Sequence, residues 1–163
     1  MLRIGIIGSG FGVIGLAPAF RGIRGCSIVA VCKRQSEWRT FLGRSDIDAV
    51  AIAVPPRAQF EIAKAAIERG LHVFAEKPLA ANTRDAKHLL RLANKRGITH
   101  GIDFLFPEIS AWKEAKKMLD KEMFGKLEHI SVHWAWLSND IKHGRSSWKT
   151  SIKEGGGLLS FYL

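Results

Sequence analysis

A glycine-rich segment near the amino terminus has residue types and a spacing that suggest phosphate binding. It reads Gly8-Ser-Gly-Phe-Gly-Val-Ile-Gly15 and directly follows an apolar run. Glycines there let the chain turn sharply and approach a pyrophosphate, whose charge is met by the amides and dipole of a following helix. The usual pattern would place its third glycine at Val13, so the segment alone is a weak signal. A flanking strand and helix make dinucleotide binding the favoured interpretation over a merely tight turn.

Two cations follow the second apolar run, where a dinucleotide site usually carries an acid. They are Lys33 and Arg34, and the first acid after them is Glu37. A carboxylate at this point would bind the ribose 2′-hydroxyl of NAD, whereas arginine can bind the 2′-phosphate of NADP through two parallel hydrogen bonds. The pair therefore favours NADP. The alternative is that both cations are ordinary solvated surface residues.

The triplet Glu76-Lys77-Pro78 follows another apolar run and carries a third kind of chemistry. A lysine and a glutamate at a strand end point into the crevice where such sheets bind ligands. There the ammonium of Lys77 can orient a substrate hydroxyl or assist its deprotonation. A surface ion pair is the alternative interpretation.

Apolar runs alternate with helical patterns along the first two thirds of the chain, and this alternation must position the residues above. The expected strands are residues 2–7, 27–32, 48–54, 71–75 and 98–104, and the first two expected helices are residues 11–22 and 58–69. A third helix is expected to start at a cap by Asn82 or Thr83 and to stop at Gly97, with its apolar stripe formed by Ala86, Leu89, Leu90 and Ala93. Short runs that are apolar throughout are typical of strands buried on both faces of a parallel sheet. The pattern predicts an α/β fold, a Rossmann-type doubly wound sheet with its ligands at the carboxyl ends of the strands.

The pattern changes after residue 104. A helix is expected over residues 110–122, and in residues 127–137 the apolar side chains alternate as in a half-buried strand, with Ile130, Val132, Trp134 and Trp136 on one face. That strand has no second strand in this sequence to pair with. We therefore predict a dinucleotide-binding domain over residues 1–104 and the start of an α+β substrate domain over residues 105–163.

Composition excludes several classes of protein. The 163 residues are 47% hydrophobic and 25% charged, as in a folded globular protein rather than a disordered one. The net charge of +10 is spread along the chain, which argues against a nucleic-acid-binding patch. Two cysteines, Cys26 and Cys32, form neither a disulfide framework nor a zinc site, so we expect a reducing cytoplasm, and we expect no membrane partner. The six histidines show no metal-binding spacing, so we expect no metal site.

Taken together, the chain resembles the glucose-fructose oxidoreductase, inositol dehydrogenase and rhizopine-catabolism (Gfo/Idh/MocA) dehydrogenases. The matching segments are Gly8–Gly12 with Pro18-Ala-Phe20, Asp48–Pro56, His72–Pro78, Asp103-Phe104, Gly125–Ile130, Trp148-Lys-Thr150 and Gly155–Gly157. The resemblance implies an NAD(P)-dependent oxidoreductase acting on a sugar, cyclitol or nucleotide-sugar hydroxyl. It makes Lys77 the substrate-orienting lysine, puts Glu76 near the nicotinamide ribose and Pro55 near the dinucleotide, and places Trp148 near a ligand.

With this resemblance, the residues expected to bind the cofactor are Gly8, Ser9, Gly10, Phe11, Gly12, Lys33, Arg34, Pro55, Glu76 and Lys77, and the expected catalytic residue is Lys77. Three features depart from the family pattern. Residues 33–47 are too short for the usual helix and strand, Gln59 stands where many members carry histidine, and the sequence ends before the histidine that serves as acid or base.

The leading hypothesis is a shortened relative of these dehydrogenases, weak or inert in this form, that transfers a hydride between a sugar-like hydroxyl and the nicotinamide. The second hypothesis is a non-catalytic protein, either a nucleotide-binding remnant or a homo-oligomeric assembly module. It rests on the unpaired edges and the two tryptophans of the expected strand at residues 127–137, which a monomer would expose. The third is a basic nucleic-acid binder.

Overall fold

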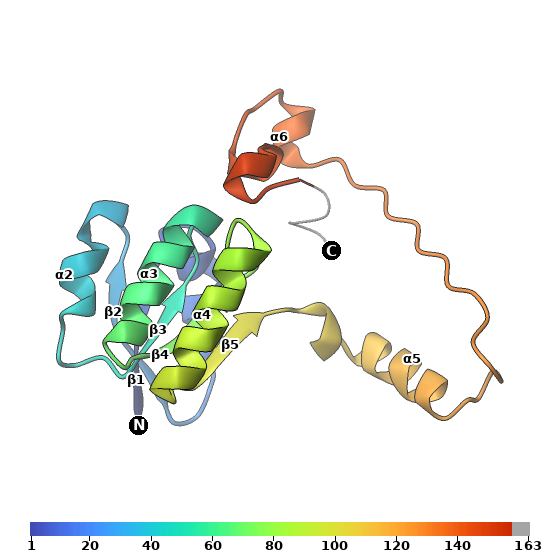
Figure 1. Ribbon diagram of the computed structural model, residues 1–163, viewed down its shortest axis with the longest axis horizontal. Coiled ribbons are helices and arrows are strands. Elements are labelled where there is room, and N and C mark those ends of the chain that lie inside the picture. Colours follow the sequence, from blue (N-terminus) through green and yellow to red (C-terminus); the bar gives the residue numbers. More distant parts are fainter. Residues whose placement is uncertain (158–163) are drawn as a thin grey trace. The chain divides into compact units, whose positions relative to one another are not determined.

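The structure, a computed structural model, describes residues 1–157 and contains a five-stranded parallel sheet (Figure 1). Its strands are β1 (Leu2–Ile7), β2 (Cys26–Cys32), β3 (Ala49–Ile52), β4 (His72–Glu76) and β5 (His100–Asp103). They lie in the order β2-β1-β3-β4-β5, and every neighbouring pair is parallel. The Rossmann-type sheet predicted from the apolar runs is therefore confirmed.

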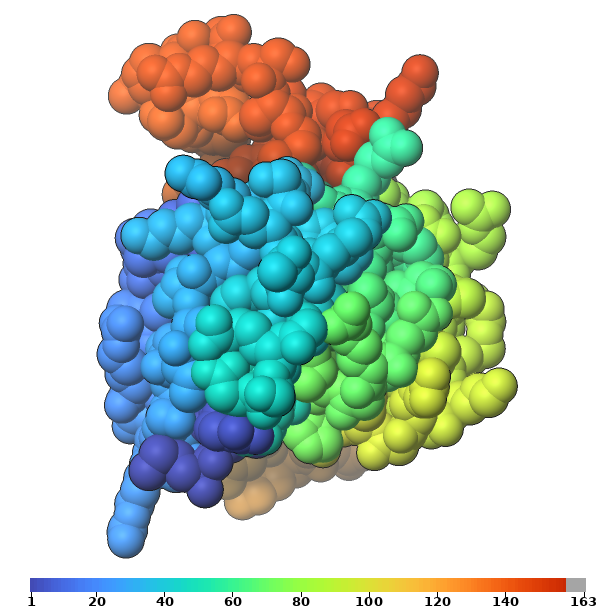
Figure 2. Space-filling model, turned by 90° about the vertical axis from the view of Figure 1, so that its left-hand side faces the viewer, coloured from blue at the N-terminus to red at the C-terminus, as the bar shows by residue number. Residues whose placement is uncertain are grey.

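Helices cover both faces of this sheet, as the doubly wound prediction requires. They are α1 (Ala17–Arg21), which continues a π-helical turn at Gly12–Leu16, α2 (Trp38–Leu42), α3 (Pro56–Glu68) and α4 (Thr83–Arg96). Figure 2 shows α2 in light blue beside α3 in teal and green on one face of the molecule. On that face buried side chains of α3 and α4, including Ile62 and Leu89, join those of the strands in the larger core. On the other face Leu16 and Ala17 pack on Ile4 and Ile6.

The helix ends follow the signals in the sequence. The side chain of Asn82 accepts a hydrogen bond from the backbone N–H of Asp85 and so caps the start of α4. Gly97 ends that helix in the left-handed conformation, with φ +64°. The apolar stripe predicted for α4 is wrong at Leu90, which is 48% exposed. The face of α4 that meets the core is the one that carries Leu89 and Ala93.

The sheet order is that of a Rossmann sheet without the outermost strand on the β2 side. Dinucleotide-binding folds use the order 3-2-1-4-5-6, and removing strand 3 leaves the order seen here. Residues 33–48 form a single helical turn at Gln35–Glu37 and the short helix α2, and no strand. The short connection noted in the sequence therefore leaves β2 as an edge strand.

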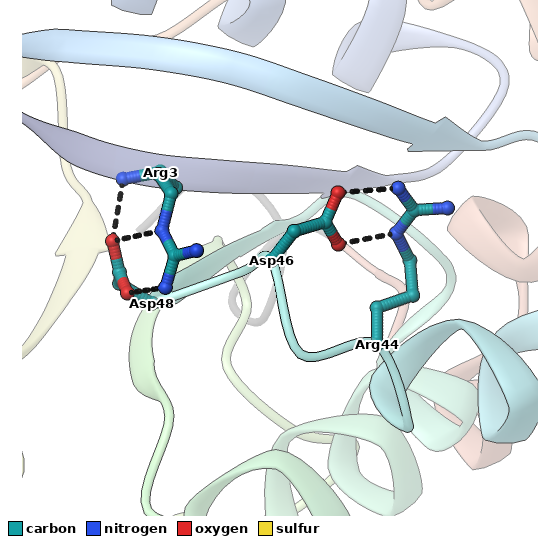
Figure 3. Close-up of polar contacts among 4 residues, drawn as sticks. All are labelled: Arg3, Arg44, Asp46 and Asp48. Atoms are coloured by element: carbon teal, nitrogen blue, oxygen red, sulfur yellow. Dashed lines mark hydrogen bonds and ion pairs between the residues drawn. The ribbon is translucent and has the colours of Figure 1, made fainter.

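Two arginine–aspartate pairs lie at the amino edge of the sheet and in the loop that leads to β3 (Figure 3). The Arg3 guanidinium donates to both carboxylate oxygens of Asp48, at 3.0 and 2.6 Å, and its backbone N–H donates to the same group at 2.8 Å. These bonds hold the pKa of Asp48 down at about 2. Arg44 and Asp46 form a second bidentate pair within the loop. The first pair connects β1 to the residue before β3, whereas the second is local.

Residues 104–145 form a separate unit. It contains α5 (Ser110–Asp120) and α6 (Asn139–Lys142), together with a helical turn at Phe106–Glu108. The strand predicted at residues 127–137 is wrong, because that segment has no regular secondary structure. Ile130, Val132, Trp134 and Trp136 are all exposed, although the Trp134 ring meets the edge of Phe106 at 5.7 Å between ring centroids. No strand of residues 1–157 pairs with this segment.

Residues 146–157 belong to the first unit rather than to residues 104–145. They contain two short helical turns, Trp148–Thr150 and Ile152–Glu154. The region expected to form one second domain, residues 105–163, is thus divided between the two units, and residues 158–163 lie outside the described part. Within residues 1–157, none of the helices has the length and apolar character needed to cross a bilayer.

Candidate functional site

The strand register brings the motifs of the sequence to one edge of the sheet. Ile7 pairs with both Cys32 and Ile52, Ile52 pairs with Ala75, and Ala75 pairs with Ile102. The residues that follow these five positions are Gly8, Lys33, Ala53, Glu76 and Asp103. Parallel neighbouring strands lie about 4.8 Å apart, so the glycine turn and the Glu76 strand end are two strand spacings from each other.

Gly8 is required at its position for two reasons. Its φ is +139°, a backbone conformation that side chains disfavour, and a Cβ there would lie 2.3 Å from the carbonyl oxygen of Ala53. Its N–H donates to the carbonyl of Cys32 at 3.0 Å. Gly8 therefore lets the chain leave β1 tightly between β2 and β3.

The turn that follows is open to a ligand. Apart from its two chain neighbours, none of residues 1–157 has an atom within 4 Å of the position that a Cβ on Gly10 would take. The backbone N–H groups of Ser9, Gly10 and Phe11 donate no hydrogen bond to any of residues 1–157. The Phe11 ring lies against Gly15 and leaves the turn unblocked, whereas a Cβ on Gly12 would lie only 3.2 Å from Ile6 Cγ2, so glycine lets the helical segment pack close to β1. This geometry can hold a pyrophosphate on main-chain amides.

The two cations after β2 are exposed. Lys33 and Arg34 lie at the surface directly after β2, and the Arg34 guanidinium donates to Glu37 at 3.1 Å. An exposed ion pair of this kind contributes little to stability, about 0–1 kcal/mol, so a phosphate can replace its carboxylate. The structure places both cations beside the glycine turn, because the Cys32 carbonyl binds the Gly8 amide.

Glu76 and Lys77 are half-buried at the end of β4. Oε2 of Glu76 accepts the backbone N–H of Lys77 at 3.2 Å. Burial and the neighbouring Asp103 carboxyl raise the pKa of Glu76 to about 7. Burial also lowers the pKa of Lys77, against the opposing effect of the Glu76 charge. A lysine with a lowered pKa is suited to exchange a proton with a hydroxyl.

Gln59 holds the segment that carries these two residues. Its side chain is fully buried, and its Nε2 donates to the backbone carbonyls of Glu76 at 2.5 Å, Pro78 at 3.0 Å and Leu79 at 3.3 Å. The amide thus connects α3 to the turn that follows β4. The sequence marked this residue only as a departure from the family, and its structural role depends on contacts 17 to 20 residues away.

The carboxyl-terminal segment packs beside the same turn. A Cβ on Gly155 would lie 2.8 Å from Ala81 Cα and 3.0 Å from Pro56 Cβ, so glycine permits the close approach. The charge of Lys149 acts on Lys77. Two segments singled out in the sequence, residues 148–150 and 155–157, therefore lie next to the carboxyl ends of β3 and β4.

A cleft of about 770 Å³ lies between the start of α3 and this segment. It is lined by Gln35, Pro55, Arg57, Ala58, Glu61, Ser146, Ser147, Trp148, Ser151 and Glu154. An ion pair of 3.1 Å joins Arg57 to Glu154 across it. Figure 2 shows the red carboxyl-terminal segment beside α2 and α3. Pro55 and Trp148 thus line the same cleft as Gln35, the residue that follows Arg34. Residues 1–157 contain no cluster of three side chains that could hold a metal ion.

Comparison with known proteins identifies the family. Residues 2–104 match the model of the Gfo/Idh/MocA oxidoreductases, described as an oxidoreductase family with an NAD-binding Rossmann fold. The chain belongs to this family. The matched residues cover the whole sheet and the residues predicted to bind the cofactor or to act in catalysis, but not Trp148.

Individual relatives agree with this membership. A dTDP-3,4-didehydro-2,6-dideoxy-α-D-glucose 3-reductase from Streptomyces violaceoruber is 31% identical, and the match covers 97% of this chain and 50% of the relative. An uncharacterized oxidoreductase from Synechocystis is 28% identical, over 97% of this chain and 47% of the relative. The chain therefore spans about half the length of these two Gfo/Idh/MocA relatives.

A solved structure shares the fold. The 3-ketoreductase KijD10 from Actinomadura kijaniata, solved in complex with NADP, superposes with a TM-score of 0.67 at 25% identity. The superposition covers 77% of this chain and 45% of KijD10. This chain thus has the NAD(P)-binding Rossmann fold of the Gfo/Idh/MocA oxidoreductases.

Proposed function

We propose that this chain binds NADP in preference to NAD and is the dinucleotide-binding part of a reductase or dehydrogenase for a sugar-like hydroxyl. The observation that carries the proposal is the open turn at Gly10, whose three amides donate to none of residues 1–157 and lie on the same sheet edge as Glu76 and Lys77. The sugar-nucleotide reductase from Streptomyces and the NADP complex of KijD10 support this substrate class and this cofactor.

In this proposal the residues along the sheet edge bind different parts of the dinucleotide and the substrate. Residues Gly8 to Gly12 bind the pyrophosphate, Lys33 and Arg34 bind the adenosine 2′-phosphate, and Pro55 contacts the dinucleotide. The nicotinamide, when bound, supplies or accepts the hydride. Glu76 lies near its ribose, and Lys77 orients the substrate hydroxyl and exchanges its proton.

Binding of the dinucleotide is tested by calorimetry with NAD and NADP, using the whole chain and Gly10→Asp. A Cβ at Gly10 would meet no described residue other than its chain neighbours, so the variant is expected to fold while its carboxylate repels the pyrophosphate. We expect loss of more than tenfold in affinity, or about 1.4 kcal/mol. Gly22→Asp is the matched control, because its Cβ also makes only ordinary contact and Gly22 lies at the other end of the helical segment. Equal binding by both variants would refute the site.

The preference for NADP is tested separately with Arg34→Ala. Loss of a charge-assisted contact to the 2′-phosphate is expected to weaken NADP about tenfold and to leave NAD unchanged. Arg44→Ala is the control, since Arg44 is also an exposed arginine paired with a carboxylate in its own loop. An equal loss for both dinucleotides would contradict the role of Arg34.

A second candidate function, assembly with another copy of this chain, is favoured by the exposed apolar side chains of residues 127–137. Trp134 is 43% exposed and Trp136 is 65% exposed, in a segment without regular structure. Sedimentation velocity tests it with the double variant Trp134→Glu, Trp136→Glu. We expect self-association in the unaltered chain and its loss in the variant; a monomer at all concentrations contradicts this function.

A further inference from the structure

The carboxyl groups of Glu76 and Asp103 are neighbours at the ends of β4 and β5. The two residues are register partners in adjacent parallel strands, so their side chains point to the same side of the sheet. Both are half-buried. Two carboxylates held this close in a partly dry environment repel each other, and a shared proton removes the repulsion.

One oxygen of Glu76 has an unmet need for a hydrogen bond. Its Oε2 accepts the N–H of Lys77, but Oε1 is buried and has no partner among the described residues. A buried acceptor without a partner is costly, by about 1–3 kcal/mol. A proton between Oε1 and the Asp103 carboxyl would give both groups a hydrogen bond.

The charged groups around the pair come from three segments. Lys77 directly follows Glu76 after the end of β4, Asp103 ends β5, and Lys149, from the carboxyl-terminal segment, acts on Lys77. The negative pair favours the ammonium form of Lys77, whereas burial and Lys149 favour the neutral amine. The pKa of Lys77 therefore depends on how many protons the pair holds.

We propose that Glu76 and Asp103 share one proton at neutral pH and that this pair is the proton store for Lys77. The relay rests on the proposed function of Lys77. When a hydroxyl is oxidised while the pair has lost its shared proton to water, the hydroxyl proton binds the neutral Lys77 amine and then moves to the pair, where it becomes the shared proton until water removes it. In carbonyl reduction the proton travels the opposite way. Asp103 acts through Glu76 and is a positioning residue for the shared proton.

The test is an NMR titration of the whole chain without dinucleotide, observing the ¹³C signals of the side-chain carboxyls and of lysine Cε. In the unaltered chain we expect Glu76 to titrate with a pKa of about 7, assigned by its loss in Glu76→Gln. In Asp103→Asn the Glu76 titration should move toward its ordinary value of 4.5. Asp120→Asn, the same change on the exposed face of α5, should leave it unmoved.

The signal of Lys77 separates a proton store from a merely structural contact. We expect its Cε shift to show a step at the same pH as the pair, and we expect Asp103→Asn to abolish that step. A Glu76 titration near 4.5 in the unaltered chain, or a Lys77 signal without a step near neutrality, would overturn the proposal. The titration contains no dinucleotide, so a negative result would contradict the proton store alone. The proposed dinucleotide site would be contradicted by a different result, unchanged binding in Gly10→Asp.

Discussion

Residues 1–103 and residues 104–145 contain similarly clear amphipathic patterns, but they differ in what those patterns bury. In α4, the apolar side chains of Leu89 and Ala93 join a core shared with α3 and the sheet. In α5, Trp112 is 55% exposed and Leu119 is 44% exposed. No residue of the 104–145 unit is buried. An amphipathic pattern thus predicts a helix, but its stability depends on a partner surface.

The largest expected difference between the two units is in the cost of removing an apolar side chain. Ile62 is fully buried in the larger core, so Ile62→Ala should lower the free energy of unfolding by about 2–5 kcal/mol. Ile130→Ala, in the exposed segment, should change it by less than about 0.5 kcal/mol. Urea denaturation followed by circular dichroism measures both. Comparable losses would mean that residues 104–145 share a core with the sheet.

The two units should also differ in how much stability is lost when a glycine with a positive φ is replaced by alanine. Gly8→Ala should destabilise the sheet by roughly 3 kcal/mol, because the new Cβ meets the Ala53 carbonyl and the φ is positive. Gly125→Ala also has a positive φ, of +78°, but its Cβ would meet no atom. We expect about 1 kcal/mol or less there. Thermal unfolding of the two variants distinguishes them, and an equal shift would refute the packing role of Gly8.

The buried side-chain amide of Gln59 should make the next largest contribution to the free energy of unfolding. Gln59→Leu leaves the carbonyls of Glu76, Pro78 and Leu79 without their shared donor, at an expected cost of about 1–3 kcal/mol. Hydrogen exchange in residues 76–81 should accelerate while that of α5 stays the same. Gln59→Glu should resemble Gln59→Leu above the pKa of the introduced acid, because a carboxylate cannot donate. Unchanged exchange in residues 76–81 would contradict this role.

The free energy of unfolding should depend on pH through a group in the first unit, the Glu76 carboxyl. Because the pKa of Glu76 is raised from 4.5 to about 7, the folded chain binds more protons than the unfolded chain between these values, and stability falls as pH rises through them. Asp103→Asn removes part of the cause, so it should be more stable than the unaltered chain above pH 7, by about 1 kcal/mol. The gain should vanish below pH 4.5. Urea denaturation at several pH values measures it.

The smallest effect is expected at an exposed ion pair. Arg44→Ala breaks the local contact with Asp46 and should change stability by less than about 0.5 kcal/mol. Arg3→Ala breaks a pair that also connects β1 to the residue before β3, so its effect should be the larger of the two. Chemical denaturation at low and high salt compares them. A larger loss for Arg44→Ala would show that sequence separation of the partners is unimportant here.

Several features of the sheet were predictable because their causes are local. The apolar runs around Ile6 and Val50, the cap at Asn82 and the left-handed Gly97 depend on residues within a few positions along the chain. The strand expected at residues 127–137 failed for the complementary reason. Alternation specifies two faces, but a strand forms only where another strand takes up its backbone hydrogen bonds.

The sequence by itself determined the alternation of strands and helices, the glycine turn after β1 and the family to which the chain belongs, because each resides in short, ordered motifs. Only the tertiary structure decided that Gln59 supports the Glu76 turn, that Asp103 lies beside Glu76, and that residues 146–157 belong to the unit that contains the sheet. These depend on strand register and on side-chain contacts between distant segments, which no local pattern encodes.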